Sequence, residues 1–96
     1  MPRRRRRAGS IPRVLLYLAE GCHLCKRARA TVVEAQRQLG FELEEVVIDG
    51  DEELEARYRE SIPVVEIDGK QEFVYFVNAA ALRRKLAQTP GSEGTL

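Results

Sequence analysis

The sequence lacks a long apolar run, and this absence argues against a membrane-spanning helix. Its longest apolar stretch is Val14–Ala19, whereas a helix that spans a bilayer needs roughly 18 apolar residues. The basic first residues are also not followed by the longer apolar segment and cleavage site of a secretory signal peptide. We therefore expect no membrane association and a cytoplasmic location, where thiols stay reduced and structural disulfides are rare.

Cysteine and histidine are scarce, and their number argues against a closed zinc site within one chain. The two cysteines and the single histidine all lie in the stretch AEGCHLC, residues 19–25. Structural zinc usually takes four protein ligands, so Cys22, His23 and Cys25 would need ligands from elsewhere. A metal or cluster shared between two chains stays open as an alternative. A disulfide across so short a loop would stabilise the fold by only about 2 kcal/mol, which argues against a purely structural bond.

Acidic residues are absent before Glu20, and this divides the chain by charge. Six of the sixteen basic residues lie in the first thirteen positions, and the rest of the chain carries ten basic and fifteen acidic residues, a net charge of −5. We expect residues 1–12, with the run Arg3–Arg7, to form a disordered basic tail, and residues 88–96 a flexible C-terminal tail. An arginine run attracts nucleic acid, anionic lipid or acidic protein. Because basic and aromatic residues do not alternate elsewhere, we do not expect nucleic acid as a partner.

Between the tails, residues 13–87 predict one domain in which strands and helices alternate. Strands are predicted over Arg13–Leu18, which as a continuous apolar run should be buried on both faces, and over Phe41–Asp49, Val64–Ile67 and Glu72–Val77. Helices are predicted between Cys22 and a left-handed Gly40, from Gly50-Asp51 to Tyr58, and after a capping Asn78. The side chains expected to face the core are Leu24, Ala28, Val32, Ala35 and Leu39 in the first helix, Leu54 and Tyr58 in the second, and Leu82 and Leu86 in the third. The order β-α-β-α-β-β-α predicts an α/β fold with a four-stranded mixed sheet flanked by helices.

In such a sheet, the two cysteines would stand at the carboxyl edge, where the first helix begins. Side chains three positions apart on a helix lie about 5–6 Å apart at Cβ, so a small adjustment closes a disulfide. Amide groups and the helix dipole stabilise a negative sulfur at a helix start, which favours Cys22 as the attacking thiol. Cys25 would lie deeper and resolve the mixed disulfide. His23 would stabilise the thiolate further if protonated, or it is a solvent-exposed spacer.

The segment SIPVV, residues 61–65, adds a second element to the candidate site. Pro63 immediately precedes a predicted strand, a position at which proline is tolerated. A cis Ile62–Pro63 bond would bring this loop toward the thiols and expose the Ile62 backbone for pairing with a substrate strand. The composition alone favours the trans bond.

These motifs, in this order, resemble a glutaredoxin-like protein of the thioredoxin fold, in the small bacterial branch that carries C-H-L-C. The resemblance rests on LLYLAEGCHLC, VVID and RYRESIPVVEIDGK and covers about Arg13 to Ala87. It implies that Cys22 is the nucleophile, that Cys25 is the resolving thiol, and that Ile62–Pro63 is a cis-proline loop beside them. With His23 and Leu24, this loop is expected to contact the substrate.

Two features of related families are absent. Phe73–Leu82 has no glycine pair followed by an acid, which helps glutaredoxins to hold glutathione, and no tryptophan precedes the motif as in thioredoxins. We expect a monomer with no bound cofactor, and with glutathione or a reductase as electron donor. The predicted function is a thiol–disulfide oxidoreductase acting on a disulfide-containing protein or a small-thiol disulfide. The alternatives are a glutathione-linked iron–sulfur cluster or metal carrier, and a non-catalytic binding module with the thioredoxin fold.

Overall fold

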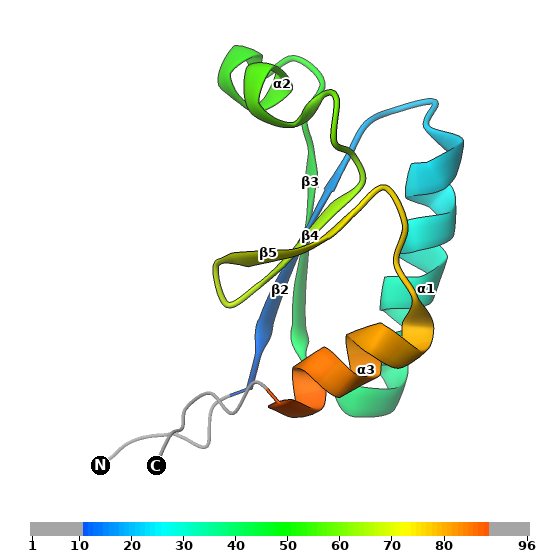
Figure 1. Cartoon of the computed structure of the whole chain (residues 1–96). Helices are drawn as coiled ribbons and strands as arrows, with labels where there is room; N and C mark the ends of the chain where they lie inside the picture. The colour runs from blue at the N-terminus through cyan, green and yellow to red at the C-terminus, as the bar shows by residue number, and fades with distance from the viewer. Residues whose placement is uncertain (1–10, 89–96) are drawn as a thin grey trace.

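The computed structural model describes residues 11–88, so residues 1–10 and 89–96, which hold most of the two expected tails, lie outside the described residues. Strands and helices follow one another in the predicted order (Figure 1). They are β2 (Arg13–Leu18), α1 (His23–Leu39), β3 (Glu42–Val47), α2 (Glu52–Tyr58), β4 (Val64–Ile67), β5 (Lys70–Val74) and α3 (Ala79–Gln88). No helix among residues 11–88 is long and apolar enough to cross a membrane.

The strands form one mixed sheet of four strands in the order β3-β2-β4-β5. β2 runs parallel to β3, whereas β4 runs antiparallel to both β2 and β5. A parallel pair needs a crossover connection, and α1 supplies it between β2 and β3. The carboxyl ends of β2 and β3 therefore share one edge of the sheet, and the chain enters α1 and α2 from that edge (Figure 1). The predicted α/β fold with a four-stranded mixed sheet is confirmed.

The helices cover the two faces of this sheet unequally. On one face, α1 and α3 contact each other and cover a cluster of twelve buried residues (Figure 1). On the other face, α2 is the one helix of residues 11–88 that packs against the sheet, and the buried cluster there consists of Ile48, Tyr58 and Val64. The larger core thus lies under α1 and α3.

β2 is not buried on both faces as its apolar run predicted. Val14, Leu16 and Leu18 are buried in the core under α1 and α3. Leu15 and Tyr17 point to the other face and are only half-buried. The reason is the length of α2, whose seven residues cover only one end of that face.

The predicted end of α1 is confirmed, but one predicted core residue is exposed. Gly40 adopts a φ of 80° and donates its N–H to the Gln36 carbonyl at 2.7 Å, which is the left-handed cap expected of glycine. Leu39 is 51% exposed, so its predicted place in the core is wrong. The chain reverses at Gly40, and Phe41 closes this end of the core instead. The buried residues of α1 are Cys25, Ala28, Val32 and Ala35.

β5 (Lys70–Val74) is displaced from the predicted strand over Glu72–Val77. It begins directly after Asp68 and Gly69, which form the predicted hairpin turn with φ values of 51° and 84°. It ends early because the chain turns sharply at Tyr75, where φ is 72°. No local sequence signal marks this second turn, since no glycine stands there.

The remaining element boundaries agree closely with the sequence. β3 (Glu42–Val47) lies inside the predicted strand over residues 41–49. The Asp51 carboxylate accepts the Leu54 N–H at 3.0 Å and caps α2. The Asn78 side chain accepts the Ala81 N–H at 2.9 Å, so its predicted capping of α3 is confirmed.

Candidate functional site

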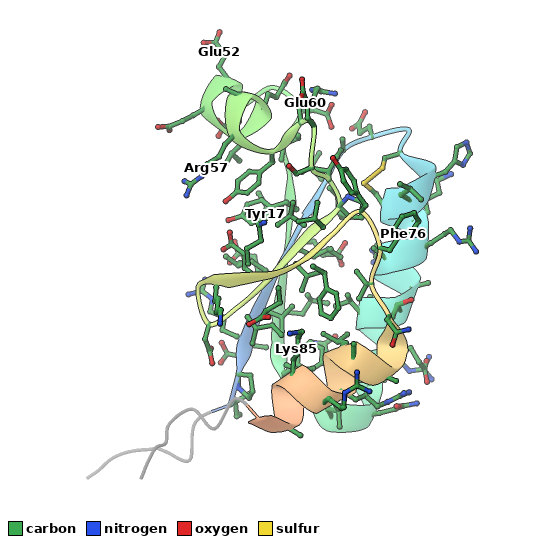
Figure 2. All side chains as sticks on the ribbon, viewed as in Figure 1. Tyr17, Glu52, Arg57, Glu60, Phe76 and Lys85 are labelled. Atoms are coloured by element: carbon green, nitrogen blue, oxygen red, sulfur yellow. A yellow bond between two sulfur atoms is a disulfide. The ribbon has the colours of Figure 1, made fainter. Side chains whose placement is uncertain are left out.

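Cys22 and Cys25 lie at the carboxyl edge of the sheet, where α1 begins. β2 ends at Leu18, the loop Ala19–Gly21 follows, and Cys22 is the N-cap of α1. The two cysteines form a disulfide with their Cα atoms 5.1 Å apart. Figure 2 shows it as a yellow bond beside the first turn of α1. The structure thus brings together the pair that the spacing singled out.

The two sulfur atoms lie in different surroundings. Cys25 is 3% exposed and belongs to the core under α1 and α3, whereas Cys22 is half-buried at its margin. The Cys25 N–H donates to the Cys22 sulfur at 3.1 Å, and the first turn of α1 contains no acidic residue. An amide hydrogen and the positive end of the helix dipole therefore both favour negative charge on the Cys22 sulfur.

No charged side chain is buried in the part of the chain that the structure describes. Cys25 therefore has no buried carboxylate beside it that could take its proton. Within the same residues, no group of three or more His, Cys, Asp or Glu side chains is placed to hold a metal ion. The chemistry that these residues themselves offer is that of two thiols.

The loop before Cys22 is held in place by Asp49, which the sequence did not single out. The Glu20 N–H donates to the Asp49 carboxylate at 2.8 Å. The other oxygen of this carboxylate lies 3.6 Å from the Arg59 guanidinium, just after α2. Asp49 follows β3 just as the loop that leads to Cys22 follows the parallel strand β2. An acidic residue directly after the predicted neighbouring strand was therefore the sequence signal that could have identified Asp49.

The Ile62–Pro63 peptide bond is cis, and both side chains are held by the fold. Pro63 is buried, while Ile62 is half-buried and packs against the core cluster that Cys22 also borders. The Ile62 N–H donates to the Tyr58 carbonyl at 3.1 Å, the last turn of α2. The expectation that the whole Ile62 backbone is free to pair is therefore wrong for its N–H. Among residues 11–88, no donor reaches the Ile62 carbonyl.

His23 and Leu24 are separated by the geometry of α1. His23 is exposed at the first position of the helix. Leu24 is half-buried and lines a groove of about 290 Å³ between α1 and the segment Tyr75–Val77. Arg27 also borders this groove and adds a basic side chain to its lining. Of the two residues between the cysteines, His23 thus faces solvent and Leu24 faces the groove.

The disulfide itself borders a second groove, on the opposite flank of α1. This groove has a volume of about 190 Å³ and lies between the start of α1 and the end of β3. Cys22, Cys25, Lys26 and the half-exposed Val47 are among its lining residues. Both flanks of the first turn of α1 are therefore hollowed.

Tyr75 is the second residue of the site that sequence reasoning missed. Its N–H donates to the Pro63 carbonyl at 2.9 Å, and its hydroxyl donates to the Glu60 carbonyl at 2.5 Å. These bonds join the segment after β5 to the loop that contains Ile62. No local sequence signal predicts them, because they depend on a left-handed tyrosine.

Comparisons with known proteins agree with this arrangement. The model of the family described as Glutaredoxin-like domain (DUF836) matches residues 13–87. An uncharacterised protein of Mycobacterium tuberculosis is 29% identical over 85 residues, which cover 83% of this chain and 88% of that protein. A structure from X. campestris is 32% identical with a TM-score of 0.66, covering 80% of this chain and 99% of that one. A structure of a protein from Nitrosomonas europaea is 31% identical with a TM-score of 0.66, covering 79% and 92%.

The thioredoxin-like character of the fold is confirmed by a more distant structure. Fasciola hepatica thioredoxin superimposes with a TM-score of 0.59 at 24% identity, covering 81% of this chain and 80% of that one. At this identity the likeness shows the fold alone. The predicted resemblance to glutaredoxin-like proteins is confirmed by the family match. Together with the pair Cys22 and Cys25 on this fold, the match indicates a redox function.

Proposed function

As the chain belongs to the glutaredoxin-like domain family, we propose that it is a thiol–disulfide oxidoreductase that uses Cys22 and Cys25. One observation carries the proposal: Cys22 caps α1 and its sulfur accepts the Cys25 N–H at 3.1 Å, while Cys25 lies one turn inside, already bonded to it. A thiolate is stabilised at such a position, and its resolving partner is within reach.

The exposure of the two cysteines supports different roles for them in this proposal. Cys22 borders solvent, so a substrate disulfide can approach it, whereas Cys25 is nearly enclosed by the core. In the reduced protein, the Cys22 thiolate attacks one sulfur of the substrate disulfide. The substrate disulfide breaks, and the attacked sulfur forms a mixed disulfide with Cys22. The other substrate sulfur leaves as a thiolate and takes up a proton.

Resolution transfers the electrons completely. Cys25 gives its proton to solvent and attacks the Cys22 sulfur, which releases the second substrate sulfur as a thiolate that is then protonated. The substrate gains two electrons and two protons, and the protein is left with the Cys22–Cys25 disulfide, the state that the structure describes. A thiol reductant, glutathione or the dithiol of a reductase, returns the protein to the dithiol by the same exchange in reverse.

The proposed substrate class is supported by the open surroundings of Cys22. The grooves on the two flanks of α1 have volumes of about 290 and 190 Å³ and are open at the surface, so they offer room for side chains that neighbour a substrate disulfide. We therefore propose a disulfide-containing protein or small-thiol disulfide as substrate, with contacts from His23, Leu24 and Ile62. We propose no resident cofactor, and we propose that the protein acts as a monomer.

Trapping the intermediate tests the role of each cysteine. Reduced Cys25→Ser protein, mixed with a disulfide-bridged peptide, should accumulate a mixed disulfide that mass spectrometry locates at Cys22. Cys22→Ser is the matched control, because it retains one thiol in the same helix turn yet should form no such adduct and show no turnover with dithiothreitol as donor. Full reductase activity in Cys22→Ser would sink the assignment.

A further inference from the structure

Tyr75 holds a backbone conformation that its side chain disfavours. Its φ is 72°, and the Phe76 N–H donates to the Val74 carbonyl at 2.8 Å across it. A hydrogen bond that spans one residue of positive φ marks a strained γ-turn. In residues 11–88, only Asp68 shares a positive φ without being glycine, and aspartate tolerates it in a hairpin turn far better than an aromatic residue does.

Two hydrogen bonds oppose this strain, and both reach the same loop. The Tyr75 N–H donates to the Pro63 carbonyl at 2.9 Å. The Tyr75 hydroxyl donates to the Glu60 carbonyl at 2.5 Å. The two accepting carbonyls lie on either side of Ile62, so one residue holds the loop at both ends. Figure 2 shows Glu60 at the end of α2 and Phe76 over α1, with the loop and the disulfide between them.

A strained backbone persists only where the surrounding contacts over-determine it. A glycine at residue 75 would adopt this φ without cost but would offer no hydroxyl to the Glu60 carbonyl. The N–H bond to Pro63 would survive in any non-proline residue. The feature that specifically requires tyrosine is therefore the hydroxyl bond, which spans from the segment after β5 to the end of α2.

We propose that Tyr75 is a positioning residue that fixes the loop Ser61–Pro63 beside the disulfide before a substrate arrives. The proposal rests on the proposed function, because it assigns the loop a part in binding the substrate of Cys22. The Ile62 N–H is engaged within the loop and its carbonyl has no donor among the described residues. Because the loop is held at Glu60 and Pro63, it presents the Ile62 carbonyl in one fixed orientation. A substrate that binds there does not have to order the loop first.

The kinetic test compares Tyr75→Phe with Tyr75→Gly. Tyr75→Phe removes only the hydroxyl, and because one hydrogen bond corresponds to about a three- to tenfold change in an equilibrium, we expect KM for a disulfide-bridged peptide to rise by about that factor. kcat should stay within about twofold, since neither thiol is touched. Tyr75→Gly should show at least the same rise in KM although its backbone is relieved of strain. Asp68→Gly is the matched control, because it relieves the other left-handed residue far from the site, and its kinetics should equal those of the wild type.

A second measurement needs no activity, so it stands even if the proposed function fails. In the oxidised protein, amide hydrogen exchange at Ile62 and Tyr75 should be several-fold faster in Tyr75→Phe, with exchange at Val65 in β4 unchanged. If the Ile62 amide exchanged equally fast in Tyr75→Phe and in the wild type, and KM were the same in both, the proposal would be overturned. So would acceleration at Val65 as large as at Ile62, because it would reduce Tyr75 to a general contribution to stability. If the wild-type protein reduced no disulfide but Tyr75→Phe showed the expected exchange pattern, the proposed function would be overturned. The positioning of the loop Ser61–Pro63 by Tyr75 would still stand.

Discussion

The two faces of the sheet differ in size and in what they contribute to the site. The face under α1 and α3 has twelve buried residues and includes Cys25. The face under α2 has three, and it is extended by Tyr17, whose ring stacks on Tyr58 with centroids 4.1 Å apart. The thiols border the larger core, whereas Asp49, which anchors the loop before Cys22, is bridged to Arg59 just after α2. Ile62 packs against both clusters, so the loop that contains it joins the two faces beside the site.

A cavity under α1 and α3 should have the largest effect on stability. Leu82 is fully buried in α3, so Leu82→Ala should lower the free energy of unfolding by about 2–5 kcal/mol. Urea denaturation followed by far-UV circular dichroism measures this. Leu39→Ala is the control, because Leu39 is an exposed leucine of α1 and its loss should cost far less. Equal losses would mean that the larger core does not carry the fold.

The smaller face should yield a smaller loss that depends on pH. Tyr58 is buried and its hydroxyl donates to the Glu66 carboxylate at 3.0 Å. Burial, followed by the neighbouring Tyr17 hydroxyl and this carboxylate, raises the pKa of Tyr58 above its ordinary value. A raised folded-state pKa favours the neutral phenol, so the stabilisation is present below about pH 10 and is lost as the pH rises above it.

Tyr58→Phe tests both parts of this prediction. At neutral pH it should lower the free energy of unfolding by about 1 kcal/mol, the net worth of a hydrogen bond. Above about pH 10 it should lose less stability with rising pH than the wild type does, as urea titrations at several pH values would show. Glu66→Gln keeps an acceptor without the charge, so its alkaline slope should fall between the two. An alkaline slope that is identical in all three proteins would refute the role of Tyr58.

The hydrogen bond from the Glu20 N–H to the Asp49 carboxylate should matter least for stability and more for the rate of disulfide reduction. Asp49→Ala removes the acceptor of the Glu20 N–H, which is exposed and can bond water instead, so we expect a loss below about 1 kcal/mol. The reductase rate should fall several-fold, because the loop before Cys22 loses its anchor. Asp68→Gly removes a matching bond at the other end of β2, where the Asp68 carboxylate accepts the Arg13 N–H at 2.9 Å. If both variants slowed turnover equally, the anchoring role of Asp49 would be wrong.

Much of this molecule was predictable from sequence because local rules govern it. Gly40 and Asn78 act at the helix ends through contacts with residues a few positions away, and such contacts depend on the local chain alone. The place of Cys22 and Cys25 followed from the strand before them and the apolar stripe after them. The order of the elements and the position of the two thiols can therefore be predicted from the sequence pattern.

The misses have a common physical origin in contacts between distant segments. Leu39 fitted the helical pattern, but Phe41 closes that end of the core after the turn. The hydroxyl bond of Tyr75 to Glu60 and the carboxylate bond of Asp49 to Glu20 join residues 15 and 29 positions apart. The roles proposed for His23, Leu24, Ile62 and Pro63 in substrate binding stay predictions, since they depend on a partner and not on the fold.

Among residues 11–88, β3 is the outermost strand on one side of the sheet, and this has a consequence for how copies of the protein meet. An edge strand offers unpaired backbone groups to any other strand, and charged side chains discourage such pairing. β3 carries Glu42, Glu44 and Glu45, and the last two are bridged to Arg13 at 2.9 Å and Arg29 at 2.6 Å. Joining two such edges would strip water from these ions and bring glutamates of the two copies together. These charges therefore disfavour edge-to-edge pairing of two copies through β3, although the neighbouring strand β2 is strongly apolar.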